Sequence, residues 1–170
     1  MNHPKYALAT LTVLAGVLVA LVIASDPWLP EKVATHFEIS GTPNGWMSRS
    51  VHAAFILGTA AFVAIVCAGT TYLTRFLPDS MINIPNRAYW LAPERRRETD
   101  DKVFALGLWI ACLTVAFILG LHVLIVRANR RVPVRLPAVE GVGLMLAFLL
   151  GIGGLILFSC AWSWRIESRG

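Results

Sequence analysis

The charges of this 170-residue chain are distributed very unevenly, and this feature constrains its fold more than any other. A transmembrane α-helix needs about 20 mostly apolar residues to cross the hydrocarbon core of a bilayer. Asp, Glu, Lys and Arg are absent from four stretches that reach this length, at residues 6–25, 51–74, 103–126 and 141–164. The pattern predicts an all-α, polytopic membrane protein in which four transmembrane helices form a single membrane domain over residues 1–170.

The composition excludes several other classes of protein. Hydrophobic residues make up 56% of the chain and charged residues 15%, which is the opposite of an intrinsically disordered composition. Three cysteines cannot all pair and are far apart, so a disulfide-rich secreted scaffold is not expected. The net charge of +5 comes from basic residues scattered over several loops, so we expect the lipid bilayer and not nucleic acid as the partner.

The first uncharged stretch has an alternative interpretation as a signal peptide. Lys5 provides a positive start, and residues 22–24 resemble a small-residue cleavage site. However, the apolar run is longer than the 7–15 residues of a usual signal sequence. We therefore interpret residues 6–25 as an uncleaved membrane anchor.

The distribution of Lys and Arg predicts the orientation in the membrane. Nine of these residues lie in the head, the loop 75–102 and the tail, and six lie in the loops 26–50 and 127–140. The side richer in Lys and Arg is usually cytoplasmic. This places both termini inside and loops 26–50 and 127–140 outside, although the arginines of loop 127–140 weaken the contrast.

Two loops are long enough to have a structure of their own. In the outer loop 26–50, the four-residue spacing of Leu29, Val33 and Phe37 favours a short helix over 31–37, and 41–45 has the composition of a turn. In the inner loop 75–102, Tyr89 and Trp90 suit an interfacial anchor, and Pro93 suits the first turn of a charged helical extension of the third span.

The sequence contains no signature of a known enzyme class. It has no phosphate-binding Gly-rich loop ending in Lys-Ser/Thr, no His-Glu-x-x-His and no Gly-x-Ser-x-Gly. The spans contain no Asp, Glu, Lys or Arg, which ion pumps and ion-coupled transporters commonly carry within the membrane. Cys67, Cys112 and Cys160 lie inside spans and are expected to behave as small apolar residues. We expect a protein that is not an enzyme and has no cofactor.

Three histidines are predicted on the same side of the membrane. His36 lies in the outer loop, and His52 and His122 lie near the outer ends of the second and third spans. Neutral imidazole is a common metal ligand, and three would hold a zinc ion with one open position. The alternative, with histidines that form hydrogen bonds to the backbone, is the more common situation, so His36, His52 and His122 are only a minor metal hypothesis.

Glycines recur within the spans, where a missing side chain lets two helices approach closely. This predicts a tightly packed bundle and leaves a homo-oligomer open. The glycines concerned are Gly58, Gly69, Gly107, Gly120, Gly141, Gly143, Gly151, Gly153 and Gly154.

Two segments resemble a known family. Residues 29–37 read Leu-Pro-Glu-Lys-Val-Ala-Thr-His-Phe, and residues 41–48 read Gly-Thr-Pro-Asn-Gly-Trp-Met-Ser. Together with residues 83–94, they resemble the N-terminal membrane domain of SdpI-like bacterial immunity proteins over about residues 10–95. The resemblance implies a multi-pass protein of the bacterial cytoplasmic membrane. The best understood relative protects its cell against a secreted toxin and holds a transcriptional repressor at the membrane.

The resemblance suggests two groups of functional residues. The first is a recognition surface in the outer loop, and the second is the inner-loop motif; the alternative for the first group is that it only builds the turn. From these we expect toxin immunity or envelope sensing, with a peptide toxin or envelope factor outside and a cytosolic regulator inside. A small transporter or channel subunit is the alternative function. The two groups are His36, Gly41, Gly45, Trp46 and Ser48, and Pro85, Asn86, Tyr89 and Trp90.

Overall fold

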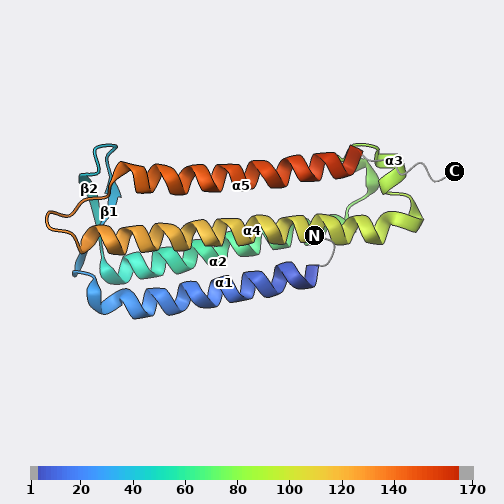
Figure 1. Ribbon diagram of the computed structural model, residues 1–170. Coiled ribbons are helices and arrows are strands. Elements are labelled where there is room, and N and C mark those ends of the chain that lie inside the picture. The colour runs from blue at the N-terminus through green and yellow to red at the C-terminus, as the bar shows by residue number, and fades with distance from the viewer. Residues whose placement is uncertain (1–3, 165–170) are drawn as a thin grey trace.

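Four long helices dominate the computed structural model, which describes residues 4–164. They run up and down alternately along one axis (Figure 1). Their positions match the four uncharged stretches, which confirms the predicted all-α membrane fold. The helices are α1 (Pro4–Ser25), α2 (Arg49–Leu73), α4 (Pro93–Asn129) and α5 (Ala138–Trp164).

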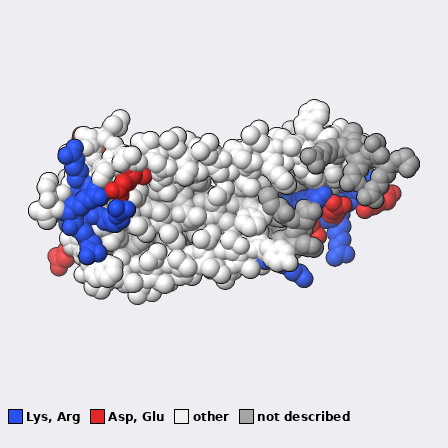
Figure 2. All heavy atoms as spheres, viewed as in Figure 1, with Lys and Arg blue, Asp and Glu red and all other residues white. Residues whose placement is uncertain are grey.

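The surface of the bundle is that of a membrane protein. Figure 2 shows charged side chains gathered at the two ends of the visible face, with an uncharged belt between them. None of the most apolar part of α5 is buried, and Leu150 and Leu157 are 76% and 72% exposed. Exposing so many apolar side chains to water would cost about 25 cal/mol for each Å². Lipid is therefore the medium that fits these helices.

The core lies between α1, α2 and α4. Leu18 of α1, Ile56 of α2 and Leu108 and Val115 of α4 are buried together there. Helix α5 packs on the other side of α4 (Figure 1). The rings of Phe117 and Phe148 stack between α4 and α5, with their centroids 4.6 Å apart.

Residues 26–50 contain a β-hairpin, so the predicted short helix over 31–37 is wrong. Strand β1 (Lys32–Phe37) pairs antiparallel with β2 (Pro43–Ser48), and the register sets Val33 opposite Met47. The four-residue spacing that suggested a helix is overridden by cross-strand pairing, which buries Val33 against the end of α4. A one-turn 3₁₀ helix, η1 (Asp26–Trp28), connects α1 to the hairpin.

The opposite end of the bundle carries the loop 75–102. It contains the short helices η2 (Thr74–Phe76), η3 (Asp79–Met81) and α3 (Arg87–Trp90). Pro93 occupies the first turn of α4, as predicted, and the charged extension contains i,i+4 ion pairs such as Arg96–Asp100 at 3.2 Å. We call this the α3 end and the opposite one the hairpin end.

Candidate functional site

The hairpin is held against the bundle by one side chain at the end of α4. The Asn129 side chain accepts a hydrogen bond from the Ala34 N–H at 2.8 Å and donates one to the Ala34 carbonyl at 2.9 Å. At the outer edge of β1, the side-chain amide of Asn129 therefore makes the two hydrogen bonds that a neighbouring strand would otherwise make. This arrangement fixes the hairpin relative to the helices.

Two arginines hold the segment before the hairpin and the turn of the hairpin. The Arg49 guanidinium donates to the carbonyls of Asp26 and Leu29, at 3.0 and 3.3 Å, and its Nε lies 3.5 Å from the Asp26 carboxylate. Arg135 donates to the Ser40 carbonyl at 3.0 Å. The hairpin is thus joined to α2 and to the loop that precedes α5.

Three residues of the predicted recognition surface have local structural roles. Gly41 has φ +85°, and a Cβ atom there would lie 2.1 Å from the Leu136 carbonyl oxygen, so the turn requires glycine. A Cβ atom on Gly45 would lie 3.0 Å from the Cβ of His36. Ser48 caps α2 by accepting a hydrogen bond from the Val51 N–H at 3.3 Å.

The turn itself lies earlier than predicted. Gly41 N–H donates to the Glu38 carbonyl and Glu38 N–H donates to the Thr42 carbonyl, which closes the chain over 38–42. Residues 43–45, which were predicted as part of the turn, instead belong to β2. The two register shifts around His36 accommodate this offset.

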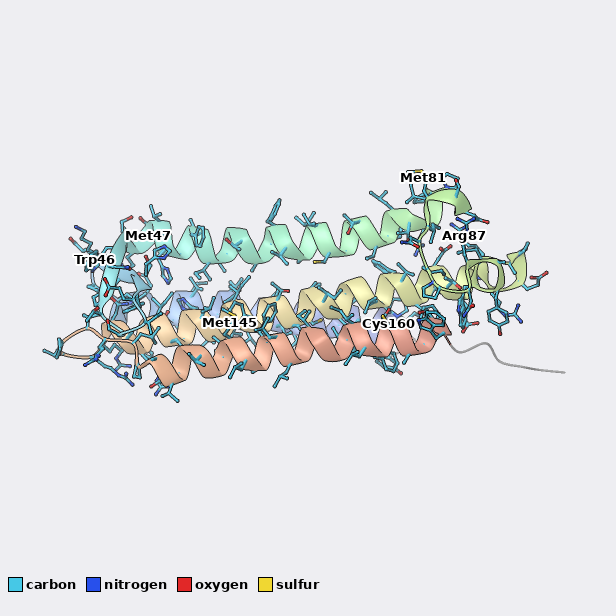
Figure 3. The ribbon with its side chains drawn as sticks, turned by 90° about the horizontal axis from the view of Figure 1, so that it is seen from above. Trp46, Met47, Met81, Arg87, Met145 and Cys160 are labelled. Atoms are coloured by element: carbon cyan, nitrogen blue, oxygen red, sulfur yellow. The ribbon has the colours of Figure 1, made fainter. Side chains whose placement is uncertain are left out.

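Three members of the predicted surface are exposed, namely His36, Trp46 and the helix-capping Ser48. Trp46 is 49% exposed and lies at the hairpin end (Figure 3). Ala34 lies opposite Trp46 in the hairpin, and its backbone N–H and C=O both bind Asn129. Ala34 and Trp46 therefore form a pair that is not joined by hydrogen bonds between the two strands. The N–H and C=O of Trp46 therefore point to the outer edge of β2, which has no neighbouring strand in the described part of the chain.

The structure brings together only two of the three histidines that were predicted as a metal site. His52 Nε2 lies 3.3 Å from His122 Nδ1, and both side chains are almost fully buried. His36 is exposed in β1. Over residues 4–164, no three His, Cys, Asp or Glu side chains are placed to hold a metal ion.

A serine extends the histidine pair into a chain of hydrogen bonds. Ser25 Oγ lies 2.9 Å from His122 Nε2 and donates to the Val22 carbonyl at 3.2 Å. A neutral imidazole has one N–H donor and one acceptor nitrogen, so His122 donates to one of its two neighbours and accepts from the other, according to its tautomer. These contacts link α2, α4 and α1.

The inner-loop motif holds the last turn of α5. Trp90 Nε1–H and the Asn86 side-chain amide both donate to the Ser163 carbonyl, at 2.8 and 3.2 Å. Carbonyls in the last turn of a helix lack partners within the helix, so these bonds satisfy one of them. Trp90 is buried in the protein, and the expectation of an interfacial anchor is therefore wrong for its ring.

The other two motif residues have different surroundings. Tyr89 stacks under Arg95, whose guanidinium carbon lies 4.0 Å from the ring centroid. Pro85 lines a cavity between α4 and α5.

Sequence reasoning missed Ser25, Arg49 and Asn129. Each is a polar residue at the end of an uncharged stretch, which is a usable signal for a residue that binds backbone groups of a neighbouring loop. Their partners were not predictable in this way, because Asn129 and Ala34 are far apart in the sequence.

The fold and these contacts define a multi-pass helical membrane protein with an ordered hairpin at one end. A family described as "Domain of unknown function (DUF1648)", a family of membrane proteins, matches residues 11–60. The matched segment includes most of α1, the whole hairpin and the first part of α2. No curated protein and no solved structure matches the chain.

Proposed function

We propose that this chain is a non-enzymatic protein of the bacterial cytoplasmic membrane that binds a peptide toxin or envelope factor at its hairpin, as the resemblance to SdpI-like immunity proteins suggests. In this proposal the hairpin end faces outward and both termini face the cytoplasm, where the α3 end would meet a regulator. The matched family segment contains the hairpin, which supports a role for this part of the chain.

One observation carries the proposal: the hairpin is rigidly held but keeps a free strand edge next to an exposed tryptophan. Asn129 occupies the edge of β1, while the backbone groups of Trp46 at the edge of β2 have no strand partner among residues 4–164. An extended peptide can add to such an edge through main-chain hydrogen bonds. A large aromatic side chain beside the edge would supply apolar contact area.

Trp28 provides a matched control for Trp46. Both tryptophans lie at the hairpin end, and they are 58% and 49% exposed, but Trp28 belongs to η1 and lies under the Arg130 guanidinium. A contact that depends on the strand edge would involve Trp46 and not Trp28.

The test is photo-crosslinking in intact cells exposed to the secreted peptides of competing bacteria. A benzophenone amino acid replaces Trp46 in one variant and Trp28 in the other. We expect adducts with a secreted peptide or envelope protein from position 46 and few from position 28. Trp46→Ala should abolish protection of the cells while membrane abundance stays unchanged. Equal adducts from both positions, or a parallel loss of abundance, would contradict the proposal.

A further inference from the structure

A cavity of about 350 Å³ lies at the α3 end, between the loop before α3 and the helices α4 and α5. Its volume falls within the range of about 300–1,000 Å³ that is typical of small-molecule sites. Leu106 and Val103 of α4, Phe158 of α5 and Ile84 of the loop form apolar walls. The cavity is at the opposite end of the molecule from the hairpin, as the positions of Cys160 and Trp46 in Figure 3 show.

Among residues 4–164, Lys102 is the cation that lines this cavity. Lys102 is the last charged residue of α4 before the uncharged stretch, so it lies where the protein passes from the headgroup region into the hydrocarbon region. Its side chain is only 15% exposed, and Nζ lies 4.7 Å from the ring centroid of Trp162 and 5.1 Å from that of Trp90. The two aromatic rings fix the position of the ammonium group beside the cavity.

The ion pair of Lys102 leaves part of its bonding capacity unused. Nζ lies 2.5 Å from a carboxylate oxygen of Glu98, whose side chain is 60% exposed and therefore lies on the water side. An ammonium group has three N–H donors, and Glu98 is the one hydrogen-bonding partner found for it among the described residues. A ligand anion would complete the arrangement.

The mouth of the cavity adjoins the surface that faces lipid. Phe158 lines the cavity and is itself 52% exposed, and its neighbour Leu157 is 72% exposed. A chain of methylene groups can therefore pass from the bilayer along Phe158 into the cavity without crossing water. Basic pockets between transmembrane helices at a membrane interface are known to bind anionic lipid headgroups.

We propose that this cavity binds one anionic phospholipid, with its phosphate at Lys102 and one acyl chain along Val103, Leu106 and Phe158. The charge of Lys102 selects the headgroup, and the apolar walls select a lipid over a soluble phosphate. The proposal is independent of the function proposed for the hairpin.

The test compares lipid binding to the purified full chain by native mass spectrometry, with phosphatidylglycerol and phosphatidylcholine as probes. Removing one basic residue near a membrane surface costs about 1 kcal/mol, so Lys102→Gln should weaken phosphatidylglycerol binding about fivefold and leave phosphatidylcholine binding unchanged. Arg97→Gln is the matched control, because Arg97 is exposed on the same helix and does not line the cavity. Similar effects of both variants, or no preference for the anionic lipid, would overturn the proposal.

Filling the cavity gives a second test that keeps the charge. Leu106→Trp, or Val103→Phe if the first variant does not fold, should reduce phosphatidylglycerol binding. Cys160 also lines the cavity and is exposed, so bound lipid should slow its alkylation by a maleimide. Glycerol 3-phosphate, which has the anion without acyl chains, should give no protection. Protection by glycerol 3-phosphate equal to that by lipid would assign the cavity to a soluble phosphate and overturn the proposal.

Discussion

His52 and His122 meet nitrogen to nitrogen inside the bundle, although they belong to different helices. Their ring planes are close to parallel, at 18°, and the ring centroids are 5.4 Å apart while the facing nitrogens are 3.3 Å apart. The rings therefore meet edge to edge, which is the geometry of an N–H···N hydrogen bond. With Ser25 on the far side of His122, the pair joins α1, α2 and α4 near the hairpin end.

Replacing the central member of this chain should destabilise the bundle. His122→Phe leaves Ser25 and His52 buried without their partner, and each unsatisfied group costs about 1–3 kcal/mol. We expect a lower melting temperature for the purified protein in detergent. In a double-mutant cycle, His52→Phe should reduce the stability of the His122→Phe variant much less than it reduces the stability of the native protein. Strictly additive losses would show that the two rings do not interact.

The histidine pair also gives an expected result for metal titration. Because His36 lies in β1, apart from the buried pair, His36→Ala should leave any binding of Zn²⁺ or Cu²⁺ measured by calorimetry unchanged. A loss of binding in His36→Ala would require a rearrangement of the hairpin toward the bundle and would restore the three-histidine hypothesis.

The Asn129–Ala34 contact should control the stability of the hairpin. Asn129→Leu removes two hydrogen bonds to the backbone of β1, each worth about 0.5–1.5 kcal/mol. Hydrogen exchange of the Ala34 amide should therefore become roughly tenfold faster, while exchange in α5 stays unchanged. Unchanged protection at Ala34 would mean that Arg49 and Arg135 suffice to hold the hairpin.

The four helices could be predicted from the sequence because the requirement that sets them is local. Each span must be apolar over about 20 residues, and this is visible in any window of the chain. The start of α4 at Pro93 was predictable for the same reason, since proline suits a first helical turn.

The hairpin and the site depend on contacts between distant segments, and these were not predictable. Residues 31–37 have a spacing compatible with either structure, and pairing with β2 decides between them. The sequence placed His52 and His122 on one side of the membrane, but their contact depends on how α2 rotates against α4. The role of Trp90 was misjudged because its partner Ser163 lies on another helix.

Substitutions of the neighbouring Trp90 and Trp162 should distinguish the effect of a hydrogen bond on stability from the effect of ring packing. Trp90→Phe keeps an aromatic ring but removes the donor to the Ser163 carbonyl, so it should cost about 0.5–1.5 kcal/mol and loosen the last turn of α5. Trp162 packs against Trp90 with the ring centroids 4.6 Å apart, and its buried Nε1–H has no partner among the described residues. Trp162→Phe should therefore be neutral or stabilising. Equal losses of stability in thermal unfolding would assign the effect to packing.

The glycines of the spans differ sharply in what surrounds them, so their substitutions should differ as well. A Cβ atom on Gly107 would lie 2.1 Å from Thr71 Oγ1 and 2.7 Å from the Cys67 carbonyl, which means that α2 and α4 touch at this point. Gly107→Ala should force the helices apart and cost about 1–3 kcal/mol.

Gly153 provides the contrast, because a Cβ atom there meets nothing within 4 Å, as is also true of Gly58, Gly69, Gly143 and Gly154. The prediction that these glycines let two helices approach closely is thus wrong at these five positions for the helices of a single chain. Gly153→Ala should raise the stability by up to about 1 kcal/mol through the higher helix propensity of alanine. A marked loss of stability in Gly153→Ala, measured by thermal unfolding at several protein concentrations, would instead reveal a second copy of the chain packed against α5.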